Sequence, residues 1–375
     1  MNNTSTFDVI VVGGGLAGLC AALHLQKLGV EVLVIEKHAY PRHKVCGEYV
    51  SNEILPYLNF LNVNPMSEGA VAIDHFEMST RDGEVIESSL PLGGFGISRF
   101  AFDKLLYDEL VKNSKVITDT VTSISFEDDV FTVMTQRNDK FNSRFVIGAF
   151  GKRSLIDRQM NRKFISERTH WMAVKAHYDY DFPENKVALH NFEGGYCGLS
   201  KTESGSVNAC YLTTLQSFQK TSGIQDFQQR VMSKNPILKE FFSSAELLFD
   251  KPLSISQISF SKKTTIENHV IMLGDSAGLI HPLCGNGMAM AINSARIFVE
   301  LFEKTILQGN GNRADLERAY QKAWKKAFAD RMRTGSVLQR ILLNDTAANY
   351  AYRVINRFPG IIPRIIRKTH GELVV

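Results

Sequence analysis

Two apolar runs that flank a glycine-rich segment at the start of the chain constrain its fold most. Phe7 to Val12 is rich in β-branched residues and predicts a buried parallel strand. The segment Gly13–Gly18 follows at once, and apolar residues then recur at helical spacing as far as Leu28. Val30 to Ile35 predicts a second strand, which ends in Glu36. This order of strand, glycine loop, helix, strand and acid is typical of a dinucleotide-binding unit.

Each conserved position of such a unit has a physical role. Gly13 permits a tight turn, and Gly15 lets the backbone approach a pyrophosphate at the helix N-terminus. Gly18 lets the helix pack closely on the strand, and Glu36 is placed to accept hydrogen bonds from a ribose. These residues predict a bound dinucleotide but do not distinguish FAD from NAD(P).

A second strand-and-turn pattern occurs near residue 275. Val270 to Leu273 predicts a strand, and Gly274-Asp275 forms the turn that ends it. An aspartate there can bond a polyol hydroxyl, and a glycine-flanked loop lets backbone amides face a flavin ring. The loop and the start of the next helix contain Pro282, Gly285, Asn286, Gly287 and Met288.

Four motifs in order resemble the flavoproteins of the p-hydroxybenzoate hydroxylase fold, and most of all their geranylgeranyl reductase and FixC-like branch. Two are described above. The third is Pro41–Glu48, PRHKVCGE, and the fourth is Arg99–Leu105, RFAFDKL. The resemblance implies an α/β fold, in which a Rossmann-like FAD-binding domain of the glutathione-reductase type contains an inserted antiparallel substrate sheet and is followed by a helical C-terminus.

The resemblance also implies a cofactor site for non-covalent FAD, with NAD(P)H as the electron donor. In the family, the arginine of the fourth motif approaches the FAD phosphates, the Gly-Asp aspartate binds the ribitol, and the cysteine loop borders the flavin ring. The residues implied to bind the cofactor are Gly13, Gly15, Gly18, Glu36, Arg42, Cys46, Gly47, Arg99, Gly274, Asp275, Pro282, Gly285, Asn286, Gly287 and Met288.

Two family patterns are altered in this chain. The family often has the sequence GADG after a central strand, whereas Gly148–Gly151 reads GAFG, so that Phe150 replaces the acid. Because that acid helps to order the nicotinamide region in relatives, the route of NAD(P)H reduction is left open. The aromatic-proline signature of many prenyl reductases is also missing, and Gly194–Ser200 occupies the comparable stretch.

We expect the two domains to be interleaved along the chain. The FAD-binding domain is predicted to comprise residues 1–70, 98–165 and 257–310. The substrate domain is predicted to comprise residues 71–97 and 166–256, where apolar and polar residues alternate with the period of strands. Residues 311–375 have helical periodicity and are predicted to form a C-terminal helical segment.

No catalytic residue is identified, but three are candidates. Cys46 either tunes the flavin or fills a tight gap as a small apolar residue. Lys44 is either a catalytic cation or a solvated or phosphate-facing side chain. Tyr196 either lines the substrate pocket or packs in a core, and the same alternatives apply to His190 and Tyr211. Cys284 is more simply explained by packing, whereas His281 is either a proton donor near the ring or a loop histidine bonded to backbone groups. No His/Cys cluster has the spacing of a metal site.

Charge is distributed unevenly. Residues 311–375 contain 13 Lys and Arg against 5 Asp and Glu, a net charge of +8, whereas the remainder has 30 against 34, a net charge of −4. The basic segment is predicted either to meet an acyl carrier protein or an anionic membrane surface, or to pack on the FAD domain with solvated charges. Nothing indicates nucleic-acid binding. With no signal peptide and an odd count of 5 cysteines, we expect a cytoplasmic protein, in part peripheral to a membrane.

The sequence thus predicts an FAD-dependent oxidoreductase. Its first expected reaction is NAD(P)H-dependent monooxygenation, by hydroxylation or epoxidation, of an apolar or aromatic small molecule or a carrier-bound intermediate. Reduction of a carbon–carbon double bond, as in the geranylgeranyl reductase branch, is the close alternative. Halogenation and a non-catalytic FAD-binding role are further alternatives.

Overall fold

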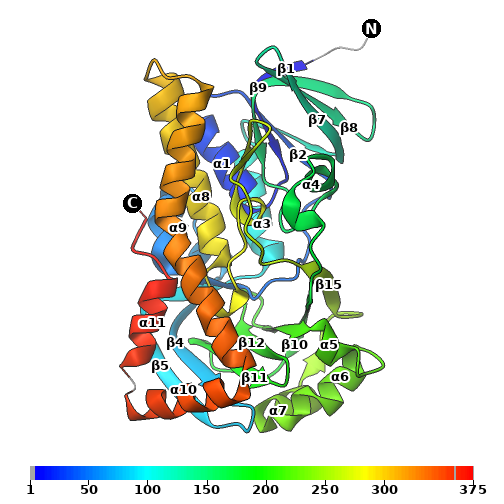
Figure 1. Cartoon of the computed structure of the whole chain (residues 1–375), viewed down its shortest axis with the longest axis vertical. Helices are drawn as coiled ribbons and strands as arrows, with labels where there is room; N and C mark the ends of the chain where they lie inside the picture. The colour runs from blue at the N-terminus through cyan, green and yellow to red at the C-terminus, as the bar shows by residue number, and fades with distance from the viewer. Residues whose placement is uncertain (1–4, 359, 375) are drawn as a thin grey trace.

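The computed structural model describes residues 5–358 and 360–374, apart from the side chains of residues 345 and 349. Two sheets organise these residues, with sheet A in the upper half of Figure 1 and sheet B in the lower half. No helix in the described ranges is long and apolar enough to cross a membrane.

Sheet A is an 8-stranded sheet that contains the predicted dinucleotide-binding unit. Its main path runs β16-β17-β9-β1-β2-β6, and the five strands from β17 to β6 are parallel. Hairpin β7–β8 adds to β9 in antiparallel fashion. The strands are β1 (Ser5–Val12), β2 (Val32–Glu36), β6 (Lys115–Thr118), β7 (Val121–Glu127), β8 (Val130–Thr135), β9 (Lys140–Gly148), β16 (Ile266–Glu267) and β17 (Val270–Met272).

Both faces of sheet A are covered, as the apolar runs of its strands require. On one face, Val9 and Val11 pack with the helices α1 (Leu16–Lys27), α3 (Arg99–Leu110) and α8 (Gly287–Phe302). On the other face, Ile10 and Val12 pack with hairpin β7–β8 and α4 (Leu155–Gln159). The carboxyl ends of β1, β2 and β17 therefore carry the glycine loop, Glu36 and Gly274 at one edge of the sheet.

Sheet B is a 9-stranded sheet with the order β14-β10-β13-β12-β11-β4-β5-β3, and β15 also pairs with β10. Among the described residues, its strand pairs are antiparallel except for the parallel pair β4 and β11. The strands are β3 (Tyr49–Ser51), β4 (Val71–Ser79), β5 (Val85–Gly96), β10 (Trp171–Asp179), β11 (Lys186–Phe192), β12 (Gly195–Lys201), β13 (Val207–Thr214), β14 (Glu246–Leu247) and β15 (Leu253–Ile258).

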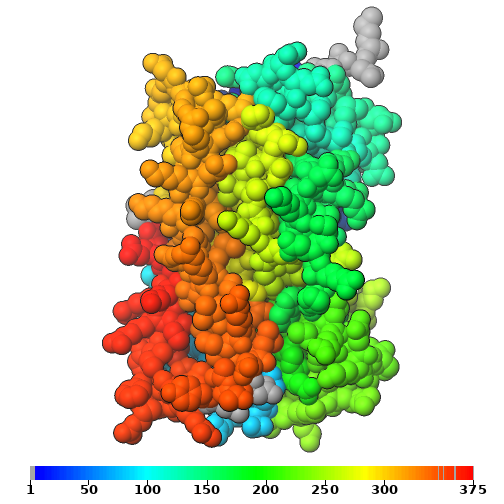
Figure 2. Space-filling model, in the orientation of Figure 1, coloured from blue at the N-terminus to red at the C-terminus, as the bar shows by residue number. Residues whose placement is uncertain are grey.

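Helices cover sheet B from two sides. Helices α5 (Leu215–Phe218), α6 (Ile224–Arg230) and α7 (Pro236–Ser244) follow β13 and build a core on one face. The C-terminal segment forms α9 (Arg313–Leu343), α10 (Asp345–Arg357) and α11 (Ile361–Thr369), and α2 (Leu55–Phe60) follows β3. Helix α9 runs past both sheets, and α9 to α11 form the orange-to-red edge of the surface in Figure 2.

The predicted architecture is confirmed: a mixed α/β fold with a largely parallel sheet, a largely antiparallel second sheet and a helical C-terminus. The strands alternate between the sheets along the chain, as an interleaved arrangement requires. Strand β3 lies within residues 1–70, which were predicted for the FAD-binding domain, but it pairs with β5 of sheet B. The domain boundaries themselves stay a prediction.

Candidate cofactor and substrate site

The glycine loop after β1 has the close contacts that its sequence predicts. Gly13 has a φ of +106°, and a Cβ there would lie 2.4 Å from the carbonyl oxygen of Ala149. A Cβ on Gly18 would lie 2.0 Å from the carbonyl oxygen of Gly13. Gly15 differs, because a Cβ there would meet only the Nη2 atom of Arg99, at 3.8 Å. Close packing therefore requires glycine at positions 13 and 18, whereas Gly15 faces space that an anion can enter.

The N-terminus of α1 and Arg99 together fit a phosphate group. No side chain caps this helix at Gly15, and its first turn contains no acid. Its terminal N–H groups therefore still need an acceptor. Asp103 holds Arg99 in place through two hydrogen bonds of 2.8 Å. These donors suit the pyrophosphate of a dinucleotide, which the helix N-terminus favours electrostatically.

Glu36 lies at the end of β2 next to the glycine loop. Its buried carboxylate accepts the backbone N–H of Gly14 at 2.7 Å and that of His38 at 3.1 Å. The Nη2 atom of Arg42 lies 3.2 Å from the same carboxylate. Arg42 thus stands at the ribose end of the predicted cofactor site. Tyr40, which was not predicted, donates its hydroxyl to the Gly14 carbonyl at 2.5 Å.

The Cys46 loop is fixed to both halves of the molecule. Lys44 forms an ion pair with the buried Asp103 at 2.6 Å. The candidate catalytic cation is therefore already paired with a carboxylate of the protein. Burial foremost, with the Arg99 charge, lowers the pKa of Lys44. The Asn208 side chain of β13 donates to the carbonyls of Cys46 and Gly47 at 3.2 and 2.9 Å.

Arg99 brings three of the predicted motifs together. Burial alone would lower the pKa of its guanidinium, but Asp103 foremost, then Cys46 and Asp275, raise it. Cys46 and Asp275 therefore lie within electrostatic range of one cation, although they are more than two hundred residues apart in the sequence. The cysteine loop and the Gly-Asp turn thus both lie near Arg99.

A buried charged cluster joins that site to sheet B. Glu48 is fully buried and bonds Lys175 at 2.6 Å and His177 at 2.7 Å. Burial would raise the pKa of Glu48, but His177 and Lys175 together lower it. His43, Glu48 and His177 place ligand atoms within 4.8 Å of one another. Because the Lys175 ammonium already neutralises the carboxylate, the geometry is that of an ion-pair network.

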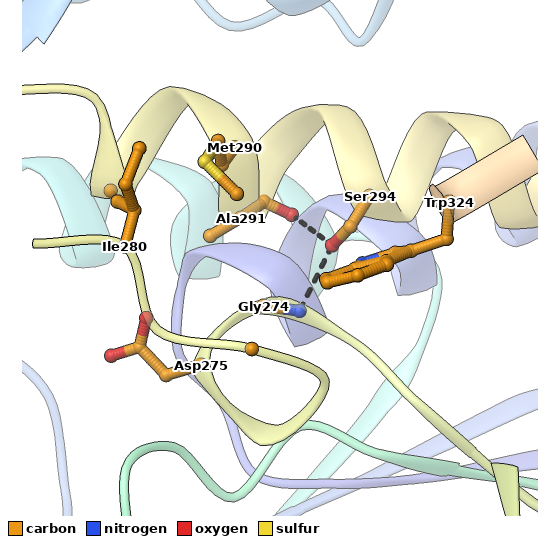
Figure 3. Close-up of a pocket in the computed structure, with 9 residues that line it drawn as sticks. Gly274, Asp275, Ile280, Met290, Ala291, Ser294 and Trp324 are labelled. Carbon is orange, nitrogen blue, oxygen red and sulfur yellow. Dashed lines mark hydrogen bonds between the residues drawn. The ribbon is translucent and has the colours of Figure 1, made fainter. Parts of the chain in front are cut away.

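The Gly274–Asp275 turn is held between α1 and α8, as Figure 3 shows. The hydroxyl of Ser294 accepts the backbone N–H of Gly274 at 2.9 Å and donates to the Ala291 carbonyl at 2.7 Å. The Asp275 side chain points away from Ser294 in this view. Its backbone carbonyl accepts the buried ammonium of Lys263 at 2.7 Å, and burial foremost lowers the pKa of Lys263 to about 8.

The loop before α8 presents its backbone as predicted. Gly285 has a φ of +62°, and a Cβ there would lie 3.0 Å from the Tyr49 ring. Asn286 is buried, Gly287 and Met288 begin α8, and no side chain caps this helix. Pro282 begins the short 3-10 turn that precedes Gly285. The helix start is thus a second place where backbone N–H groups can meet negative charge.

On the sheet side, alternation along β12 and β13 separates the two candidate tyrosines. Tyr196 pairs with Leu212, and Tyr211 pairs with Cys197. Tyr196 therefore packs with Leu283 on one face, whereas Tyr211 packs with Phe227 of α6 on the other. Of the two alternatives, core packing describes Tyr211, because adjacent positions of the two strands point to opposite faces.

Tyr196 lines a small cavity between sheet B and α9. Trp171, Leu283, Gln339 and Leu343 also line it. Burial foremost raises the pKa of Tyr196 far above its ordinary value, so its hydroxyl stays protonated. Cys284 and His281 lie beside this region against Gly335 of α9. Burial raises the pKa of Cys284 to about 12 and lowers that of His281 to about 4, so both are neutral near pH 7.

Several of these residues were missed by sequence reasoning. Lys175 had a detectable signal, since it is a lone cation in an otherwise apolar strand pattern. Glu48 had one as well, as the acid directly after Cys46-Gly47. Asn208, Lys263 and Gln339 had none, because only the folded chain brings them to the site.

The sequence matches the FAD binding domain family over residues 6–333. The chain belongs to this family. The N–H groups at the start of α1 and the Arg99 guanidinium are donors that suit a pyrophosphate, and the Glu36 carboxylate is an acceptor that suits a ribose hydroxyl, so this set fits FAD. The chain is 24% identical over 370 residues to digeranylgeranylglycerophospholipid reductase of Methanococcus vannielii, covering 92% of this chain and 89% of that protein.

Two further comparisons agree with this assignment. The chain is 23% identical over 374 residues to menaquinone reductase of Mycobacterium tuberculosis, covering 92% of this chain and 85% of that protein. A geranylgeranyl bacteriochlorophyll reductase-like protein of Thermoplasma acidophilum superposes with a TM-score of 0.77 at 19% identity, covering 98% and 97% of the two chains. The chain is therefore a flavoprotein of the oxidoreductase kind, with the fold that the sequence predicts.

Proposed function

We propose that this FAD-dependent oxidoreductase saturates a carbon–carbon double bond of an apolar substrate bound beside sheet B. The observation that carries the choice of substrate is the cavity of Tyr196, whose lining is neutral and largely apolar. The choice of reaction is supported by the two long relatives whose names are those of reductases. Monooxygenation, the first reaction expected from the sequence, becomes the second candidate.

The proposed reaction balances with one reduced nicotinamide cofactor. The substrate double bond, NAD(P)H and one proton give the saturated product and NAD(P)+. FAD, when bound, supplies the hydride chemistry between the two. The chain's own residues bind the phosphates at Gly15 and Arg99, fix the Cys46 loop through Asn208, and exclude water with the apolar side chains around Leu283.

Monooxygenation is kept as a candidate because of the same dry cavity and the missing aromatic-proline signature. In that reaction the substrate, O2, NAD(P)H and a proton give the hydroxylated or epoxidised product, water and NAD(P)+. Exclusion of water is required to couple that reaction, so a closed cavity favours it as well.

One experiment separates the candidates. The FAD-loaded protein is incubated with a prenylated quinone and NADH or NADPH, once without oxygen and once with labelled oxygen gas. The masses of the products are then measured by mass spectrometry. Saturation predicts a product with two added hydrogen atoms in the absence of oxygen. Monooxygenation predicts one added labelled oxygen atom and no anaerobic product. Failure to oxidise NAD(P)H, together with no product after chemical reduction of the flavin, would reject both.

A further inference from the structure

The cavity between sheet B and α9 contains a buried side-chain amide without a partner. Gln339 is 5% exposed, and neither its Nε2 nor its Oε1 atom has a hydrogen bond among the described residues. Buried polar groups of native proteins are almost always hydrogen-bonded. The amide therefore needs one acceptor and one donor that the described chain does not supply.

A second polar group lines the same cavity. The Tyr196 hydroxyl has no hydrogen-bond partner among the described residues. Asn191, by contrast, is already engaged, because its Nδ2 atom donates to the Ser79 carbonyl at 2.9 Å and to the Tyr352 hydroxyl at 2.5 Å. The free hydrogen-bonding capacity of the cavity thus belongs to Gln339 and Tyr196.

The lining also limits the charge of any occupant. Aromatic, aliphatic, amide and glycine residues form it, without an acid, a lysine, an arginine or a histidine. A carboxylate, phosphate or ammonium group would be buried there without a counter-charge, which is strongly unfavourable. The space admits about one water-sized group. It suits a single neutral polar head, so the apolar remainder of a ligand has to lie outside it.

We propose that Gln339 and Tyr196 recognise the hydroxyl head of a phenol or quinol substrate. A hydroxyl donates to the Oε1 atom of Gln339 and accepts from its Nε2 atom or from the Tyr196 hydroxyl, so one group satisfies the site. The assignment of this ligand as a substrate rests on the proposed function. The neutral lining of the cavity favours a substrate with a neutral hydroxyl group on a ring over a charged phospholipid.

Gln339 lies just beyond the end of the family match. The family match ends at residue 333, and Gln339 follows on the same helix, α9. The recognition site therefore combines a strand of sheet B with a segment outside the shared FAD-binding region.

The test measures binding without turnover, so that it stands apart from the reaction. The FAD-loaded protein is titrated with a prenylated naphthol, with the matched prenylated naphthalene that lacks the hydroxyl, and with the prenylated naphthyl phosphate, and flavin absorbance and fluorescence report binding. We expect the naphthol to bind most tightly. Gln339→Leu should raise its dissociation constant about tenfold and leave that of the naphthalene unchanged. Tyr196→Phe should have a smaller effect in the same direction.

Gln321→Leu is the matched control, because Gln321 is exposed on the same helix. Equal losses for naphthol and naphthalene, or no loss for either, would overturn the proposal and leave a buried water as the occupant of the cavity. Tighter binding of the phosphate would also overturn it. A selective loss of naphthol binding without any turnover would reject the proposed reaction but keep this site.

Discussion

At the scale of single residues, Asp275 tests the cofactor site most directly. In the described structure its carboxylate points away from the turn that carries it (Figure 3), while Arg99 lies within electrostatic range. Asp275→Ala should retain the fold and weaken FAD binding about five- to tenfold, because a ribitol hydrogen bond contributes about 1 kcal/mol. Titration of the apoprotein with FAD, followed by flavin fluorescence, measures the loss.

The exposed Asp330 provides the control for this substitution. Asp330→Ala removes the same group from the surface and should leave the affinity for FAD unchanged. Equal affinity in Asp275→Ala and the unaltered protein would remove Asp275 from the cofactor site.

Lys175 tests the buried ion-pair network. Lys175→Met leaves the Glu48 carboxylate buried with His177 and the backbone N–H of Arg99 as its remaining partners, which should lower the free energy of unfolding by about 3–5 kcal/mol at neutral pH. The network lowers the pKa of Glu48 in the folded protein. The network therefore stabilises the fold fully at pH values above the pKa that Glu48 has in the unfolded chain. This stabilisation is lost as the pH falls through the lower pKa that Glu48 has in the folded protein.

The difference between Lys175→Met and the unaltered protein should accordingly shrink at acid pH, where Glu48 of the variant, which has lost its Lys175 partner, becomes protonated. Urea unfolding at neutral and acid pH measures both differences. Adding Glu48→Gln to Lys175→Met should restore part of the stability at neutral pH. A deficit that is the same at every pH would show that lost packing, not charge, is the cause.

At the scale of elements, Gly15 and Gly18 belong to one loop but should respond oppositely to alanine. Gly15→Ala places a methyl group in open space near Arg99 and should keep the protein folded while reducing FAD affinity at least about tenfold. Gly18→Ala forces the same group onto the Gly13 carbonyl, 2.0 Å away, and should cost about 1–3 kcal/mol of stability. Thermal unfolding of both apoproteins, paired with FAD titration, separates the effects.

Loss of stability in Gly15→Ala, or unchanged stability in Gly18→Ala, would contradict this division of roles.

The elements of sheet A could be predicted from sequence because local patterns specify them. The β-branched run before Gly13, the acid at Glu36 and the apolar helix after Gly287 each depend on neighbouring residues only. That Cys46 and Asp275 lie near each other in the fold could be predicted only from the family resemblance. The contacts of Lys175 with Glu48 and the placement of Gln339 depend on how sheet B and α9 meet, which no local pattern encodes.

At the scale of the whole molecule, the basic C-terminal segment is partly structural. Arg331 pairs with the buried Glu53 at 3.1 Å, and the apolar sides of α10 and α11 pack Tyr352 and Ile362 against Ile86 of β5. The remaining charge faces outward. On α10 and α11, the exposed cations, which have no salt bridge to a carboxylate within the described residues, are Arg353, Arg357, Arg364, Arg367 and Lys368.

We propose that this outward face of α10 and α11 associates with an anionic membrane surface. Two aromatic side chains accompany its cations, Tyr350 at 71% and Phe358 at 60% exposure, and such a combination suits a lipid headgroup region. The protein should bind vesicles that contain phosphatidylglycerol and not those of phosphatidylcholine alone. Binding should weaken as salt rises, because exposed charges are screened beyond about 8–10 Å.

The variant Arg364→Glu, Arg367→Glu, Lys368→Glu should lower the vesicle affinity at least about a hundredfold, since each cation near such a surface contributes about 1 kcal/mol. The matched control reverses Lys115, Lys140 and Arg144, three exposed cations of sheet A, with the same change in net charge. If both triple variants lose affinity equally in vesicle sedimentation, net charge alone drives binding. If neither loses it, α10 and α11 are only a cover for sheet B, and the lipid surface is not their partner.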